Sequence, residues 1–356
     1  MTESELNAKL KSRVAAVQAA DAGVAAETLA RWDRKTKPPG SLGALETLVV
    51  RLCASAGRLD YRARQKAVVV MAADHGVAAE GVSAYPVEVT AQMVENFAAG
   101  GAAINALCRS VGARLLVADL GTLRPVMAPG VRDLRVAAGT ENFTRGPAMT
   151  EAQALTAIER GAGLAEYLVD EGVELIGLGE MGIANTSAAS AIVAALCGLS
   201  PLQAVGPGTG VDAEGRARKL QAVATALELH RPDPARPLSL LAAFGGFELA
   251  GLVGLMLGAA ARRTPVVLDG FITGAAALVA SALCPALGAH LMASHRSAEP
   301  AHDRVLERLG LSPLLQLDLR LGEGSGAALA MPLIDGALAA FHDMASFEEA
   351  GVSDSL

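Results

Sequence analysis

The chain has 356 residues, of which 52% are hydrophobic and 19% charged, so it can bury a large core, and an intrinsically disordered protein is excluded. The net charge of −7 argues against a nucleic-acid-binding protein, because such proteins usually carry an excess of basic residues. The length fits one large domain, or one with a smaller satellite.

The first 60 residues predict helices separated by a break. Apolar residues from Leu6 to Val17 recur at helical spacing. The prolines and glycines of segment 35–43 (KTKPPGSLG) stop a helix, and a second apolar pattern with helical spacing starts at Leu42.

From residue 66 onward, short apolar runs are each followed by glycines, acids or histidines and, in most cases, a helical stretch. This alternation predicts an α/β protein whose parallel sheet is covered by helices on both faces. Ligands of such sheets bind beyond the carboxyl ends of the strands, where the chemically distinctive residues of this chain also fall, so we expect one shared site there. The predicted strands are 67–73, 113–120, 174–178, 238–244, 265–268, 290–293 and 314–319.

The C-terminal part predicts one more apolar helix, over 327–346, and a frayed tail over 348–356. We expect this helix to join the N-terminal helices. The predicted organisation is therefore a small helical domain, 1–62 plus 331–356, and a large α/β catalytic domain, 63–330.

The apolar character of the chain raises the question of a membrane protein. Its most apolar stretches, 187–199, 249–261 and 275–289, are shorter than the ~20 residues of a span and are soon interrupted by proline or charge. The N-terminus is charged and lacks the apolar core of a signal peptide. Four scattered cysteines without a CxxC motif favour a reducing compartment. We therefore expect a cytoplasmic protein without a membrane partner.

The segment 177–182 (GLGEMG) matches the GxGxxG pattern of dinucleotide-binding folds. That fingerprint also requires an acidic residue about 20 positions later, and none occurs between Met181 and Val211. A dinucleotide-dependent oxidoreductase is therefore the weaker alternative. A glycine turn that leads into a helix still offers free amides to an anion, with Asn185 and Thr186 in the first turn. A helix cap without a ligand is the other alternative, but Glu180 inside the turn favours substrate binding.

A second glycine-rich loop, 206–210 (GPGTG), contains Gly208 and precedes Lys219. It does not match the P-loop pattern, which needs Gly-Lys-Ser/Thr. The loop is either an ordinary turn before a solvated helix, or an anion site to which Lys219 reaches back.

The segment 320–326 (RLGEGSG) places one carboxylate, Glu323, among glycines at a predicted strand end. Glycines let a substrate approach the backbone, and burial would raise the pKa of the carboxyl group toward that of a useful base. The alternative is an ion pair with Arg320.

The two histidines in strand-end motifs, His75 and His295, do not indicate a metal site. A metal needs three or four convergent ligands, and no H-x-x-x-H or H-E-x-x-H motif occurs. We expect hydrogen-bonded scaffold histidines and no metal.

Several motifs in chain order resemble one family, that of the nicotinate-nucleotide–dimethylbenzimidazole phosphoribosyltransferases. The resemblance runs from about residue 30 to 345, and its last motif is long and specific. The motifs are KPPGSLG (37–43), ADHG (73–76), EGVS (80–83), GPAM (146–149), GEMGIANT (179–186), GGFE (245–248), LDGF (268–271), SHRSAE (294–299) and LRLGEGSGAALA (319–330).

The resemblance implies transfer of 5-phosphoribose from nicotinate mononucleotide to 5,6-dimethylbenzimidazole, an enzyme step of cobalamin lower-ligand assembly. It also implies a three-layer, Rossmann-like α/β/α sandwich with a mostly parallel sheet and a small helical domain from both chain ends. The enzyme would be a homodimer that needs no cofactor, with the partner's small domain close to the active site. A homologue that has lost catalysis is the non-enzyme alternative.

The resemblance also implies roles for individual residues. Glu323 would be the general base, and Glu180 a second candidate that orients the base or the ribose. The residues expected to bind the phosphate and nucleotide are Gly182, Asn185, Thr186, Gly208, Lys219, Ser297 and Gly322. Those expected to bind the benzimidazole are Tyr85, Met93, Met181 and Leu321.

Overall fold

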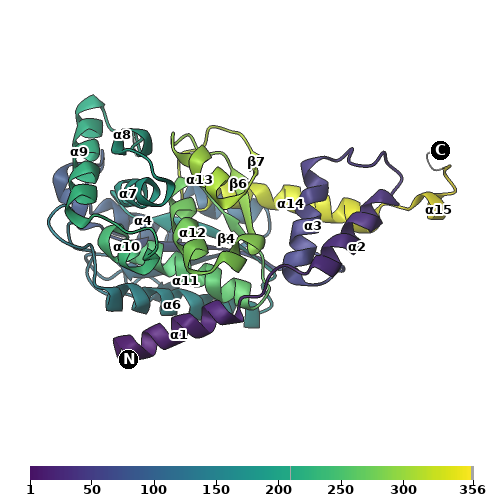
Figure 1. Cartoon of the computed structure of the whole chain (residues 1–356), viewed down its shortest axis with the longest axis horizontal. Coiled ribbons are helices and arrows are strands. Elements are labelled where there is room, and N and C mark those ends of the chain that lie inside the picture. Colours follow the sequence, from purple (N-terminus) through teal and green to yellow (C-terminus); the bar gives the residue numbers. More distant parts are fainter. Residues whose placement is uncertain (209, 354–356) are drawn as a thin grey trace.

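In a computed structural model, residues 1–208 and 210–353 are described, and they build an α/β body with a helical arm (Figure 1). The body contains a seven-stranded sheet in which every neighbouring pair is parallel, which confirms the predicted fold class. The order is β3-β2-β1-β4-β5-β6-β7. The strands are β1 (Lys66–Ala73), β2 (Arg114–Gly121), β3 (Val131–Asp133), β4 (Leu175–Met181), β5 (Val266–Leu268), β6 (Leu291–His295) and β7 (Pro313–Leu315).

This strand order places a switch point between β1 and β4. The chain runs outward from β1 through β2 to β3, and then returns to the other side of β1 with β4. Sheets of this kind bind ligands beyond the carboxyl ends of their strands, commonly near such a switch point.

Both faces of the sheet are buried, as predicted. In β1, Val69 and Met71 belong to the core on one face, and Val68 and Val70 to the core on the other. Strand side chains alternate between faces, so a strand buried on both sides is apolar throughout.

The first face is covered by α11 and α12. Behind them, α6 packs on α11, α1 packs on α6 and α11, and α7, α10 and α13 pack on α12, while α8 and α9 pack on α7. These helices are α1 (Glu3–Ala16), α6 (Glu151–Asp170), α7 (Asn185–Cys197), α8 (Pro201–Ala204), α9 (Ala213–His230), α10 (Pro237–Phe244), α11 (Phe247–Ala261), α12 (Phe271–Leu283) and α13 (His302–Leu309). The second face is covered by α4 (Val89–Ala99), α5 (Ala103–Ser110) and α14 (Ser325–Asp343). Short 3₁₀ helices span Gly76–Glu80 and Pro285–His290.

The arm consists of α2 (Ala22–Asp33), α3 (Ala44–Ala56) and the C-terminal half of α14, with α15 (Phe347–Ala350) at its tip (Figure 1). Trp32 of α2 is fully buried and packs on Phe341 of α14, with ring centroids 5.2 Å apart. The two chain ends therefore meet, whereas α1 lies along α6 of the body, where Arg13 pairs with Glu159. The division into domains 1–62 plus 331–356 and 63–330 stays a prediction.

One prediction about local structure was wrong, and one strand was missed. The run 238–244 forms α10, not a strand, because its leucines and alanines are good helix formers and Pro237 occupies the first helical turn. The three-residue edge strand β3 was not predicted, because VRD is too short and too charged to stand out. Of the tail 348–356, residues up to Ala350 belong to α15, and residues 354–356 lie outside the described part of the chain.

Across the residues that the structure describes, no helix combines the length and the apolar character needed to span a membrane.

Candidate active site

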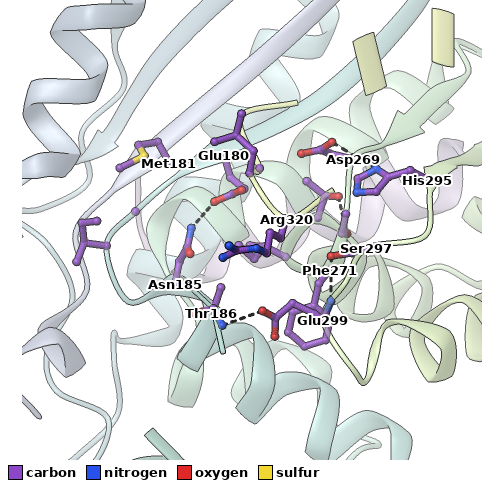
Figure 2. A pocket seen from close by; sticks show the side chains of 18 residues that line it. Glu180, Met181, Asn185, Thr186, Asp269, Phe271, His295, Ser297, Glu299 and Arg320 are labelled. Atoms are coloured by element: carbon purple, nitrogen blue, oxygen red, sulfur yellow. Dashed lines mark hydrogen bonds and ion pairs between the residues drawn. The ribbon is translucent and has the colours of Figure 1, made fainter. Parts of the chain in front are cut away.

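A pocket opens beyond the carboxyl ends of β4, β5 and β6 (Figure 2). Its walls come from the turns that follow these strands, from Gly208 and from the segment that precedes α14. This is the shared strand-end site that the sequence predicts. Most of the predicted site residues line it, namely Glu180, Met181, Gly182, Asn185, Thr186, Gly208, Ser297, Leu321 and Gly322.

Glu180 is the acidic residue at the end of β4. Only 5% of it is exposed, and the side-chain amide of Asn185 donates a hydrogen bond to its carboxylate (Figure 2). Burial, together with the nearby Asp269 carboxylate, raises the pKa of Glu180 to about 8. Glu180 can therefore exchange a proton near neutral pH.

Glu323 does not itself line this pocket, although its neighbours Leu321 and Gly322 do. Its side chain is buried, and its Oε2 has no hydrogen-bond partner among the described residues. Burial raises the pKa of its carboxyl group, while the backbone N–H of Ile104 favours the charged form. No ion pair joins Glu323 to Arg320 in the part of the chain that the structure describes, which removes the alternative considered for this glutamate.

Lys219 of α9 reaches back to the glycine loop and to the first turn of α7, and binding of an anion there stays a prediction. Its ammonium group donates to Thr186 Oγ1 over 2.8 Å and to the carbonyl of Gly206 over 3.4 Å. Lys219 is fully buried, and this burial lowers its pKa to about 8. It touches the pocket wall through Thr186 rather than lining the pocket itself. Thr209 of the glycine loop lies outside the described residues.

The four residues predicted to hold the benzimidazole are not gathered in one place. Met181 and Leu321 line the pocket, but Tyr85 and Met93 do not. Tyr85 is 56% exposed and lies in the loop before α4, and Met93 packs on the same core cluster as Met181.

Comparison with known proteins identifies the family. A family model described as a phosphoribosyltransferase matches residues 17–352. A nicotinate-nucleotide–dimethylbenzimidazole phosphoribosyltransferase of Roseiflexus sp. (strain RS-1) is 50% identical over 97% of this chain and 98% of the relative. The chain belongs to this phosphoribosyltransferase family.

Other members agree in sequence and in structure. The relative from Geobacter metallireducens is 50% identical over 94% of this chain and 96% of its own length. The crystal structure of CobT from Thermus thermophilus matches with a TM-score of 0.90 and 49% identity, over 94% of this chain and 100% of that one. The resemblance inferred from the motifs is confirmed.

Three further charged residues of this family member line the pocket and were not predicted as site residues. They are Asp269 after β5, Glu299 after β6 and Arg320 before α14. Figure 2 shows the Arg320 side chain crossing the pocket, and no hydrogen bond or ion pair to it is found among the described residues. Glu299 accepts the N–H of Gly208 over 2.8 Å and so braces the glycine loop. Each of these residues follows a predicted strand, so its expected position at the carboxyl edge of the sheet could have identified it as a site residue.

The two motif histidines differ in position: His295 lines the pocket and His75 does not, and a purely structural role for them stays a prediction. His75 is buried and pairs with Glu248 over 2.7 Å. His295 is buried beside Asp269, and burial lowers its pKa to about 4. In the part of the chain described by the structure, no three His, Cys, Asp or Glu side chains form a metal-binding group.

The raised pKa of Glu180 predicts how the stability of the protein depends on pH. This pKa is about 8 in the folded protein against an ordinary value of 4.5, so the folded state binds the proton more tightly than the unfolded chain. The contribution of Glu180 to the free energy of unfolding should then fall as pH rises through that interval, by at most about 1.4 kcal/mol per pH unit. Burial also raises the pKa of Asp269 to about 7, so this carboxyl group adds a fall of the same sign. We expect urea denaturation between pH 6.5 and 8 to show the combined fall, and Glu180→Gln to make it shallower. An equal slope in wild type and variant would contradict the expectation.

Proposed function

We propose that the protein transfers the 5-phosphoribosyl group of nicotinate mononucleotide to 5,6-dimethylbenzimidazole, and so forms α-ribazole 5′-phosphate and nicotinate. The observation that carries the proposal is the meeting of buried carboxylates with an anion-binding turn at one sheet edge. Glu180 lines the pocket directly, Glu323 lies just behind its wall, and Thr186, bound by Lys219, stands at the N-terminus of α7.

This arrangement suits the chemistry of the transfer. Nicotinate leaves as a neutral ring from a positively charged pyridinium, so the leaving group needs little acid catalysis. A benzimidazole nitrogen attacks C1′ from the face opposite the departing nicotinate, which inverts the anomeric centre from β to α. The second ring nitrogen then loses its proton, and a raised carboxylate pKa suits Glu323 for accepting it.

The donor phosphate is proposed to bind where backbone amides and one cation converge. Free N–H groups at the start of a helix attract anions, and Lys219 adds a positive charge beneath Thr186. The residues proposed for the phosphate and nucleotide remain Gly182, Asn185, Thr186, Gly208, Lys219, Ser297 and Gly322. Those proposed for the benzimidazole remain Tyr85, Met93, Met181 and Leu321.

The decisive experiment is incubation of the protein with nicotinate mononucleotide and dimethylbenzimidazole. We expect released nicotinate and α-ribazole 5′-phosphate in equal amounts, detected by chromatography and mass spectrometry. Absence of both products from folded protein would overturn the proposal. Saturable binding of NAD with hydride transfer would instead support the dinucleotide alternative.

Lys219→Ala tests the phosphate contact. Loss of a charge-assisted hydrogen bond costs about 1.5–3 kcal/mol, so the KM for nicotinate mononucleotide should rise roughly 10- to 100-fold. The KM for dimethylbenzimidazole serves as the internal control and should change little. Initial rates over a range of both substrates check the expectation, and an unchanged donor KM would argue against the contact.

We further propose that the enzyme works as a cytoplasmic homodimer in which the partner's small domain lies close to the pocket. Four free cysteines fit a reducing compartment. Light scattering tests the assembly and should give about twice the chain mass of 36.1 kDa.

A further inference from the structure

The backbone around Glu323 has an unusual conformation. Gly322, Glu323 and Gly324 are three successive residues with positive φ, at 81°, 63° and 86°. Glycine adopts such angles freely, but a residue with a side chain in the left-handed region is disfavoured by about 1–2 kcal/mol. Such a conformation persists only where its surroundings hold it in place.

Asp269, which directly follows β5, holds this backbone in place. Its Oδ2 accepts the N–H of Gly324 over 3.1 Å, and its Oδ1 accepts the N–H of Gly326 over 2.7 Å. These amides lie at the N-terminus of α14, where N–H groups have no partner within the helix. The Asp269 carboxylate satisfies two of them, and its negative charge interacts favourably with the positive end of the helix dipole. Asp269 is only 2% exposed, so the arrangement is protected from water.

The contacts around this loop leave it little room to move. A side chain at Gly326 would overlap the ring of His295, and one at Gly324 would meet Val68 and the carbonyl oxygen of Leu178. The loop is therefore pressed against β4 and β6, and Asp269 ties it to β5. The direction of the Glu323 side chain follows from the backbone that Asp269 fixes.

We infer that Asp269 is a positioning residue for the general base. By binding the amides of Gly324 and Gly326, it holds the backbone of Glu323 in the left-handed conformation, and this conformation sets the direction of the Glu323 side chain. The inference rests on the proposed function. Asp269 lines the pocket, but both of its carboxylate oxygens accept backbone amides of the loop, which is the geometry expected of a supporting residue.

The test is a double-mutant cycle with Glu323. Asp269→Ala should lower kcat about 100-fold with little change in the KM for nicotinate mononucleotide, because a small misplacement of a reacting group costs about that factor. In a Glu323→Ala background the same substitution should lower the residual kcat by less than about threefold, since residues that act as a unit are not additive. A full 100-fold loss in that background would overturn the inference and assign Asp269 a direct action on the substrate.

Asp119 offers a matched control. It is equally buried, lies near the carboxyl end of β2 at the same sheet edge and accepts the N–H groups of Gly121 and Thr122 over 2.9 and 2.8 Å, yet does not line the pocket. Asp119→Ala should destabilise the protein comparably and leave kcat within about threefold of wild type. If Asp119→Ala loses as much kcat as Asp269→Ala, general destabilisation explains both losses, and the inference is overturned.

A readout without turnover keeps the test independent of the assay. Hydrogen exchange of a peptide that covers 320–330 should be faster in Asp269→Ala than in wild type and unchanged in Asp119→Ala; unchanged exchange in Asp269→Ala would overturn the inference. If Asp269→Ala does not fold, Asp269→Asn, which keeps one acceptor oxygen, takes its place. Wild-type protein that releases no nicotinate would refute the proposed function, whereas the exchange result concerns Asp269 alone.

Discussion

Glu323→Gln should lower kcat roughly 10²- to 10⁴-fold, the range that a general base contributes. Glutamine has nearly the same shape as glutamate, and its carbonyl oxygen can still accept the N–H of Ile104. What it cannot do is take a proton from the benzimidazole. The loss should therefore appear in turnover and not in folding.

Nicotinate release at saturating substrates measures this effect, and thermal denaturation checks that the variant is folded. Glu180→Gln, assayed in parallel, separates the two carboxylates, because an orienting residue should affect KM at least as much as kcat. Near-normal turnover of a folded Glu323→Gln variant would refute the assignment of the base.

The acidic balance of the chain fits an enzyme whose donor carries a phosphate and a carboxylate. The proposed anion contacts are amides at the start of α7 and of the glycine loop, plus Lys219, which is buried. Such contacts act over a few ångströms and do not require a basic surface. A net charge of −7 is therefore compatible with binding an anionic donor.

The sequence predicted the parallel sheet and its functional edge because both depend on local patterns. A strand buried on both faces, such as β1, is a continuous apolar run, and a glycine turn marks where it ends. Pattern alone does not separate a short apolar strand from a short apolar helix, so 238–244 was assigned to the wrong class.

The support of Glu323 by Asp269 could not be predicted in the same way. The two residues are far apart in the chain, and their relation depends on which strands neighbour each other and on the left-handed backbone at Glu323. The exposure of Tyr85 could likewise not be predicted, because it depends on how its loop packs in the tertiary structure and the loop has no periodic pattern. Sequence motifs thus identified the groups proposed to react, and the structure was needed to find what holds them.

The chain contains 38 glycines, and two of them bring α6 and α11 into direct contact where these helices cross. Gly161 of α6 lies directly against the backbone of Gly251 in α11, and a Cβ at this position would overlap the carbonyl oxygen of Gly251. Because backbone cannot move aside as a flexible side chain can, Gly161→Ala must push the two helices apart. We expect it to lower the free energy of unfolding by about 3 kcal/mol, the upper end of what overpacking usually costs.

Gly163, two residues along the same helix, provides the matched control for that prediction. It is exposed, and a Cβ there would meet nothing within 4 Å. Gly163→Ala should therefore raise the free energy of unfolding by about 0.5–1 kcal/mol, because alanine loses less backbone entropy than glycine in a helix. Urea denaturation of the two variants should give shifts of opposite sign. Equal shifts would mean that helix propensity, and not the contact with Gly251, governs this position, and that the α6–α11 crossing tolerates wider spacing than its glycines indicate.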